Sequence, residues 1–542
     1  MAKDLEIPMG KRSGKYRFFE ILPGFLSYMV IILLFVISLI NPAWGAIYLL
    51  LIISTTLVKA VGVAFRTVQG YNIVKKAEKV NWAQRFKELE DPHAHYERLR
   101  GETRESYGFY EHVENLRLMA AATGEDDFPD PSKIYHAVIM VAYNEGLETL
   151  IPSVEAVKNT SYDNQRIIFV LGYEERGGEE MEQTAKALKE HFKDVFYDFV
   201  LVKHPDGVKG EIKGKGPNLS HAGEYLAEYV QKRKIPLSNV IVTSLDSDNR
   251  MSEKYLDYVA YEFTVRPDRQ RLAYQPVSLF MNNIWDATAP MRIIAVSNSF
   301  FNVISSMRPH ALRNFASHSQ PLQALYEMDF WSRKTIVEDG HQFWRSLFHF
   351  NGNYEAISIH VPIYQDAVME ETFLKTLKAQ FIQLRRWDYG ASDVAYVGVR
   401  LFNKKRTMPF LPLFAKFMRL LDGHVMLAAM SPIVAFGGWV PRLLNFESRQ
   451  LVTYNLPNTV SAVQLVASIG LMITILVSLR MLPPRPARYK KNKSIFMVLQ
   501  WVLMPVVAIV YQSFAAFYAQ TRLMTGRYME NFDVTRKVVK KE

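Results

Sequence analysis

The chain has 542 residues, of which 49% are hydrophobic, and a formal net charge of +11. This length is too great for one ordinary core, so we expect two or more structural units. The absence of cysteine excludes disulfides, a thiol nucleophile and thiolate metal ligands. The excess positive charge lies beside long apolar runs rather than along one face with interleaved aromatic side chains, so no nucleic-acid partner is expected.

Two apolar runs near the N-terminus, residues 25–40 and 46–65, are each about long enough to cross a bilayer core of roughly 30 Å. The turn between them carries no charge, whereas basic residues lie on both outer flanks. Cytoplasmic flanks of membrane helices are enriched in Lys and Arg, so the sequence predicts a hairpin with both ends in the cytoplasm. The flanking residues are Lys11, Arg12, Lys15 and Arg17 before it, and Arg66, Lys75, Lys76 and Lys79 after it.

Three more apolar runs follow late in the chain, at residues 420–440, 460–477 and 494–523. The stretch 480–493 is basic without an acid, which places it in the cytoplasm. The last run could cross once, or twice as short helices bent near Pro505 and Gln512. Because the tail after it is basic, we favour two crossings, which gives six spans, with five as the alternative.

Between the membrane segments, short apolar runs alternate with helical stretches. The runs cover residues 135–142, 165–172, 198–203 and 239–245. This alternation predicts an α/β domain with a parallel sheet covered on both faces. Ligands bind beyond the carboxyl ends of such strands, where polar residues follow each run. These residues are Asn144 and Glu145, Glu174 and Glu175, and Asp246 and Asp248.

Asp246 and Asp248 form the strongest local signal, since alternate carboxylates at the end of a buried strand can both face a hard cation. Mg²⁺ binds through one or two carboxylates and takes substrate phosphates as further ligands. Such a metal neutralises the charge that develops on a departing diphosphate. The alternative is a solvated Asp-x-Asp turn, which the position after an apolar strand disfavours.

Two further motifs have a functional and a structural interpretation. Lys215 lies in a glycine-containing basic loop and could meet a phosphate, although the spacing is not that of a phosphate-loop ATPase. Glu338 and Asp339 could supply a general base for an acceptor hydroxyl. The structural alternatives are a flexible basic loop, and acids that favour the first turn of a helix.

The segment 383–387 lies on an expected amphipathic helix over residues 370–389. Arg386 can grip a diphosphate at two points, and Trp387 offers a flat face to a sugar ring. A basic interfacial helix anchored by its Trp is the alternative, and both interpretations can hold.

In this order, the motifs resemble those of family 2 glycosyltransferases of the processive type, and the chain is similar to bacterial cellulose synthase and hyaluronan synthase. The resemblance implies an α/β domain of the GT-A (Rossmann-like) type combined with an α-helical transmembrane region. It implies that Asp246 and Asp248 bind Mg²⁺ or Mn²⁺. It also implies that Asp339, beside Glu338, is the catalytic base.

The same resemblance assigns substrate-binding roles. Gln383, Arg386 and Trp387 match Gln-x-x-Arg-Trp, which lies at the acceptor end near the diphosphate. Lys215 resembles a lysine near the nucleotide. Thr535 and Lys537 match a gating loop, Phe-x-Val-Thr-x-Lys, that closes over the nucleotide. The donor pocket would also include Tyr143, Glu145 and Glu174.

The chain departs from the family pattern in four places. Val337 replaces a usual Thr before the Glu-Asp pair, and the second strand ends in Glu174-Glu175 rather than in Asp-Asp or Asp-Gly. The first strand lacks a common Pro at its end, and we find no domain for a cyclic dinucleotide after the last span.

The resulting hypothesis is an inverting hexosyltransferase in the inner membrane, with its catalytic domain in the cytoplasm. It would transfer a sugar from a UDP-sugar to a growing polysaccharide, with membrane lipids around it. The alternatives are a non-processive transferase that adds a sugar to a lipid, and a degenerate transferase that acts as a transporter or scaffold. The expected divisions are residues 1–66 (hairpin), 67–133 (approach segment), 134–366 (GT-A domain), 367–412 (interfacial helices), 413–524 (membrane helices) and 525–542 (gating tail).

Overall fold

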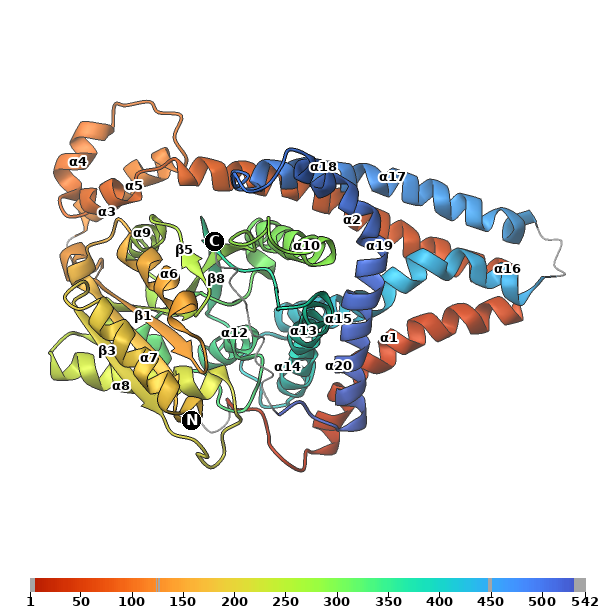
Figure 1. The fold of residues 1–542 in the computed structure, drawn as a ribbon, viewed down its shortest axis with the longest axis horizontal. Helices are drawn as coiled ribbons and strands as arrows, with labels where there is room; N and C mark the ends of the chain where they lie inside the picture. The colour runs from red at the N-terminus through yellow and green to blue at the C-terminus, as the bar shows by residue number, and fades with distance from the viewer. Residues whose placement is uncertain (1–4, 123, 125–126, 447–450, 531–542) are drawn as a thin grey trace.

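The computed structural model describes residues 5–122, 124, 127–446 and 451–530. An α/β domain forms one end of the molecule, and long apolar helices extend from it at the other end (Figure 1). Segments from both ends of the chain meet in this helical part, since α1 (Gly14–Ile40) and α2 (Pro42–Glu78) lie beside the last helices.

The four strands that the sequence predicted are present and parallel, with boundaries that differ by up to two residues. In the register between β1 and β4, Val141 is opposite Asp246, and between β1 and β2, Val141 is opposite Gly172. The three strand ends therefore meet at one edge of the sheet. The strands are β1 (Tyr135–Ala142), β2 (Ile167–Glu174), β3 (Asp198–His204) and β4 (Val240–Asp246).

The sheet is larger than predicted, and it is mixed rather than purely parallel. Its order is β3-β2-β1-β4-β7-β6-β8-β5, in which β7 runs antiparallel to β4 and β6. A three-residue strand such as β7 leaves no periodic pattern, and a fully buried strand such as β6 does not alternate. The added strands are β5 (Arg250–Met251), β6 (Leu272–Leu279), β7 (Ser319–Pro321) and β8 (Glu355–Tyr364).

Helices cover both faces of the sheet, as the alternation of runs predicted. One face packs against α6, α7 and α9, and the other against α8 and α11. Helices within the approach segment cover α9, where Trp82 stacks on Tyr258 with ring centroids 3.5 Å apart. The helices are α6 (Leu147–Lys158), α7 (Gly178–His191), α8 (Lys215–Lys232), α9 (Tyr255–Val265) and α11 (Leu322–Glu327).

Among the described residues, five helical segments are long and apolar enough to cross a membrane. The first two form the expected hairpin, in which Asn41 caps α2 by accepting a hydrogen bond from the Ala43 N–H at 2.9 Å. The hairpin is closely packed, because a Cβ at Gly45 would lie 2.9 Å from the Ser38 Cα. The five segments are Gly14–Ile40, Pro42–Glu78, Phe410–Leu444, Tyr454–Met481 and Asn492–Thr525.

The last of these segments, residues 492–525, is one long helical run whose irregular turns include Pro505 and Gln512, where the sequence predicted bends. We call it the crossing segment. Just before it, Arg488 pairs with Asp286 of the α/β domain at 2.9 Å. At its end, Arg17 donates to the carbonyl of Leu523 at 2.9 Å, near the start of α1. Both ends therefore lie on the side of the α/β domain, and the part of the segment from α19 (Met504–Val507) to α20 (Phe514–Thr525) runs transversely to α2 and α17 (Leu451–Met481) in Figure 1.

The crossing segment takes this path because its apolar side chains are buried against the domain. Trp501 and Tyr511 pack in one core with Val277 of β6 and Leu384 of α13 (Phe373–Asp388). The segment changes helical form along its length, with a π-helical stretch at Ala508–Ser513 before α20 (Phe514–Thr525). Such irregular turns place side chains on several sides, as contacts with both the domain and the bundle require.

We predict that both ends of the crossing segment lie on the same side of the membrane as the α/β domain. The natural chain has no cysteine, so Lys491→Cys and Arg527→Cys would each carry one thiol. An impermeant maleimide added on the side of the membrane that holds the α/β domain should label both thiols, because Lys491 and Arg527 are exposed.

The control for the side of the α/β domain is Lys232→Cys. The control for the opposite end of the bundle is Leu443→Cys. Labelling of Lys491→Cys and Arg527→Cys from opposite sides would show that the segment spans the bilayer.

Candidate active site

One large cavity, of about 1480 Å³, connects the sheet edge with the apolar helices. At one end it is lined by the residues that follow β1 and β4, and in its middle by α13. At the other end it reaches α15 (Phe410–Phe436) and Gln512 of the crossing segment. The cavity contains the predicted residues Tyr143, Glu145, Glu174, Lys215, Asp246, Asp248, Glu338, Asp339, Gln383, Arg386 and Trp387.

Glu145 organises the turn after β1. Its carboxylate accepts hydrogen bonds from the backbone N–H groups of Tyr143, at 2.7 Å, and Asn144, at 3.1 Å. It also accepts from the Ser247 hydroxyl at 3.3 Å, which ties this turn to the Asp246–Asp248 turn. The structure therefore gives Glu145 a positioning role at the cavity wall.

Glu174, at the end of β2, is buried and forms an ion pair with Arg176. The Arg176 guanidinium lies over the Tyr143 ring, 4.2 Å from its centroid. These three side chains form a fixed wall beside the sheet edge. The ion pair, which the sequence did not predict, leaves Tyr143 as a flat aromatic surface at the cavity.

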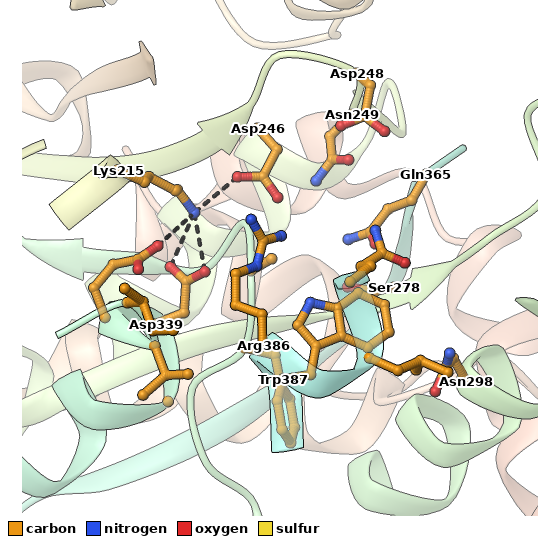
Figure 2. A pocket seen from close by; sticks show the side chains of 18 of the residues that line it. Lys215, Asp246, Asp248, Asn249, Ser278, Asn298, Asp339, Gln365, Arg386 and Trp387 are labelled. Atoms are coloured by element: carbon orange, nitrogen blue, oxygen red, sulfur yellow. Dashed lines mark hydrogen bonds and ion pairs between the residues drawn. The ribbon is translucent and has the colours of Figure 1, made fainter. Parts of the chain in front are cut away.

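Lys215 is the centre of an acidic cluster (Figure 2). Its ammonium lies 2.7 Å from Asp246 Oδ1, 2.9 Å from Asp339 Oδ2 and 3.5 Å from Glu338 Oε1. Burial disfavours the charged ammonium, but these three carboxylates outweigh it and hold the pKa of Lys215 well above its usual range. Lys215 therefore brings together two motifs that lie about a hundred residues apart in the chain.

The backbone around Lys215 explains why glycine follows it. Lys215 begins α8 rather than lying in a flexible loop, and a Cβ at Gly216 would lie 2.4 Å from the Ser332 carbonyl oxygen. Two residues further on, the buried Asn218 amide donates to the Gly172 carbonyl at 3.2 Å and fixes α8 against β2.

Glu338 and Asp339 occupy the first turn of α12 (Glu338–His349), where the helix dipole favours acids. The Asp339 side chain is 19% exposed, whereas that of Glu338 is 4% exposed. Burial, and then the charge of Asp339, raises the pKa of Glu338 to about 8. Asp339 is thus the carboxylate of the pair that is more open to the cavity.

The expected amphipathic helix is α13, and it places its motif on the cavity wall. Gln383 is buried and accepts a hydrogen bond from the Gln380 amide at 3.1 Å. Trp387 is 37% exposed, and its ring centroid lies 6.0 Å from that of Phe280. Arg386 projects between Trp387 and the acidic cluster in Figure 2.

The acids after β4 suit a cation whose coordination a substrate completes. Among the residues that the structure describes, no three His, Asp or Glu side chains form a metal-ligand cluster. Asp246 and Asp248 both line the cavity, with Asp246 turned toward Lys215 and Asp248 farther from that ammonium group (Figure 2). Two carboxylate donors leave room for the phosphate oxygens and waters that Mg²⁺ and Mn²⁺ accept as ligands.

Several cavity residues carry no sequence motif and were not predicted. They come from β6, from α10 (Ala289–Ser306) and from the connections after α10 and β8, which no recognised motif covers. Their common feature is a polar side chain on an otherwise apolar or irregular segment. They include Ser278, Asn298, Arg313 and Gln365. Thr535 and Lys537, predicted for the gating loop, lie outside the described residues.

The α/β domain brings an acid pair at the end of β4 and the Glu338–Asp339 pair at a helix N-terminus to one cavity, as expected for a glycosyltransferase of the GT-A class. The family model described as glycosyl transferase family group 2 matches residues 241–518, just over half of the chain. The chain belongs to this family. The match includes Asp246, Asp339, Arg386 and most of the crossing segment.

Solved structures show similar folds at low sequence identity. The mannosyltransferase PcManGT from Pyrobaculum calidifontis, in complex with GDP-Man and Mn²⁺, is 13% identical, with 82% of this chain and 99% of that chain covered and a TM-score of 0.41. Residues 1–349 of S. aureus TarS are 11% identical, with 73% and 93% covered and a TM-score of 0.31. The same TarS fragment in complex with UDP-GlcNAc is 10% identical, with 73% and 93% covered and a TM-score of 0.32. No curated protein sequence matches the chain.

We predict that Glu338→Gln changes the pH dependence of stability. A carboxyl whose pKa is about 8 in the fold, above its usual 4.5, binds its proton more tightly when folded. Wild-type stability should therefore fall as the pH rises between these two values. The variant, whose amide stays neutral, should lose less thermal stability over this interval.

Thermal midpoints in detergent, measured at several pH values, test this. The matched control is Glu228→Gln, on the exposed face of α8. Equal pH slopes for wild type and Glu338→Gln would contradict the shifted titration.

Proposed function

We propose that the protein is a membrane-embedded inverting glycosyltransferase that moves a sugar from a UDP-sugar to a growing glycan. The observation that carries this proposal is the meeting of Asp246 and Asp339 around one ammonium group, in a cavity that continues among apolar helices. In this proposal one carboxylate serves the donor diphosphate and the other serves the acceptor.

In the proposed reaction, Asp339 removes the proton from an acceptor hydroxyl. That oxygen attacks the anomeric carbon from the face opposite the diphosphate, whose bond to the sugar breaks. UDP leaves with the bonding electron pair, and the new glycosidic bond has the inverted configuration. Lys215 and Arg386 offset the negative charge on the leaving group.

Asp246 and Asp248 would hold Mg²⁺ or Mn²⁺ together with the donor diphosphate. A bound divalent cation supplies positive charge against the charge that develops on UDP. Lys215 and this cation would then both contact Asp246 of the acidic cluster. The ammonium offsets part of the charge of the carboxylates before the donor arrives, which lowers the cost of keeping three acids together.

A cavity of about 1480 Å³ suits an acceptor that is longer than one sugar. Trp387 offers an exposed ring next to the acidic cluster, and sugar rings pack on such faces. Beyond it, the cavity extends to α15 and the crossing segment. This continuity supports repeated addition to one glycan, with the catalytic domain in the cytoplasm and the helices in the inner membrane.

The proposal predicts donor-dependent UDP release. Purified protein should be incubated with a panel of UDP-sugars plus Mg²⁺ or Mn²⁺, while released UDP and product size are measured. Release that disappears on chelation, with long products, is expected. Products with a single added sugar would favour a non-processive transferase, and no UDP release with any donor would favour a transporter or scaffold.

Asp339→Asn should abolish transfer while UDP binding is retained. The amide has nearly the same shape but cannot take a proton, and a general base contributes about 10²- to 10⁴-fold to a rate. Transfer is followed with labelled donor and UDP binding by calorimetry.

Asp268→Asn, at an exposed position outside the cavity, is the matched control and should be fully active. Normal turnover by Asp339→Asn would rule out its role as the base.

A further inference from the structure

Five positively charged side chains gather where the cavity reaches the apolar helices. Two come from α15, one from α2, and two from the segment that follows α10. We call this group the basic cluster. Its members are Arg66, Arg308, Arg313, Lys416 and Arg419.

A hydrogen bond to His310, the shared lining of the cavity and the charges that act on His310 place these side chains in one region. The Arg419 guanidinium donates to the His310 carbonyl at 2.9 Å. Burial lowers the pKa of the His310 imidazole, and surrounding positive charges lower it further. Those charges belong to Arg419, Arg308, Arg66 and Lys416. Arg419 also acts on Arg313, which joins the fifth member to the group.

The basic cluster lacks neutralising partners within the described part of the chain. None of its members has a carboxylate oxygen within 4.0 Å, although many other cations of this protein do. The carboxylates that act electrostatically on its members are Asp393, which acts on Arg313, and Glu355, which acts on Lys416. Asp393 already pairs with His341 at 2.6 Å. The Arg308 Nε is buried with no described hydrogen-bond partner.

Gathering like charges in this way costs free energy that a bound anion would recover. A row of basic residues flanking a membrane helix needs no ligand, because such residues face water and lipid headgroups. Arg313 differs, because burial lowers the pKa of its guanidinium and its side chain lines the catalytic cavity together with Arg419. Two members of the cluster, Arg313 and Arg419, therefore face the cavity.

Beside the basic cluster, α10 and α15 each contribute an exposed residue to the lining of the cavity. Phe301 of α10 lines it and is 51% exposed, and Gly423 of α15 is also exposed. Lys416 and Arg419 lie near the beginning of the candidate span Phe410–Leu444. A lipid phosphate would be at this depth, while its tails stay among apolar side chains.

We propose that the basic cluster binds the phosphate group of an anionic membrane lipid, which enters between α10 and α15 and carries the acceptor. This inference rests on the proposed function and specifies its acceptor class as a lipid-anchored glycan with a phosphate linkage. The cluster holds the lipid phosphate, and the cavity leads from it to Asp339.

The test uses purified full-length protein in neutral detergent and soluble short-chain lipids, without nucleotide. Dioctanoyl phosphatidic acid should bind saturably, and dioctanoylglycerol, which lacks the phosphate, should not. Arg419→Gln and Arg308→Gln should each weaken phosphatidic acid binding about tenfold or more, since each removes a charge-assisted contact. Arg442→Gln, at the opposite end of the bundle, is the matched control and should bind as wild type does.

Three outcomes would overturn the proposal. Unchanged binding in both Arg419→Gln and Arg308→Gln would remove the cluster from the site. Equal binding of dioctanoylglycerol would show that the tails alone are recognised. Inorganic phosphate that displaces the lipid at equal concentration would show a site for a free anion instead.

Asp246→Asn separates this proposal from the catalytic one. It should lose transfer but bind phosphatidic acid as wild type does, because Asp246 pairs with Lys215 in the acidic cluster and belongs to a different group of side chains. Lipid binding by a protein that shows no transfer with any donor would refute only the proposed function, whereas transfer without lipid binding would refute only the lipid site.

Discussion

The ion-pair cluster around Lys215 is the interaction on which the catalytic end depends. Asp246 follows a strand, Asp339 begins a helix, and neither element orients the other directly. The buried ammonium between them is what holds the two carboxylates near one point. Breaking a buried ion pair leaves uncompensated charge, which costs about 3–5 kcal/mol when one partner is removed. The ammonium thus offsets part of the acidic charge before substrate binds, and the donor enters a site whose acids are in place.

A second constraint connects this site with the membrane helices. The crossing segment packs on β6 and α13 and ends beside α1, so the α/β domain and the bundle share one apolar core. The cavity lies along this shared boundary. The acidic cluster and two members of the basic cluster, Arg313 and Arg419, therefore line one cavity, together with Arg386 and Trp387.

Much of the α/β domain could be predicted because its first strands are continuous apolar runs followed by polar residues. The cavity-lining Asp246, Asp339 and Trp387 were predicted from motif order, although not their mutual contacts. Lys215 was expected near phosphate, and only the fold shows it among carboxylates. The path of residues 492–525 could not be predicted, because hydropathy does not distinguish burial in protein from burial in lipid. Arg313 and Arg419 belong to no motif, and their proximity depends on how α15 packs.

The shared core also determines which fragments and fusions of the protein can be handled in solution. A fragment that ends with the α/β domain would expose Val277 and Leu279 to water, since they pack in one core with Trp501 and Tyr511. Exposed apolar patches of this kind promote association. The catalytic domain is therefore not a separable soluble module, and insertions or fusions are best tolerated on the far side of the sheet, near β3 and α7.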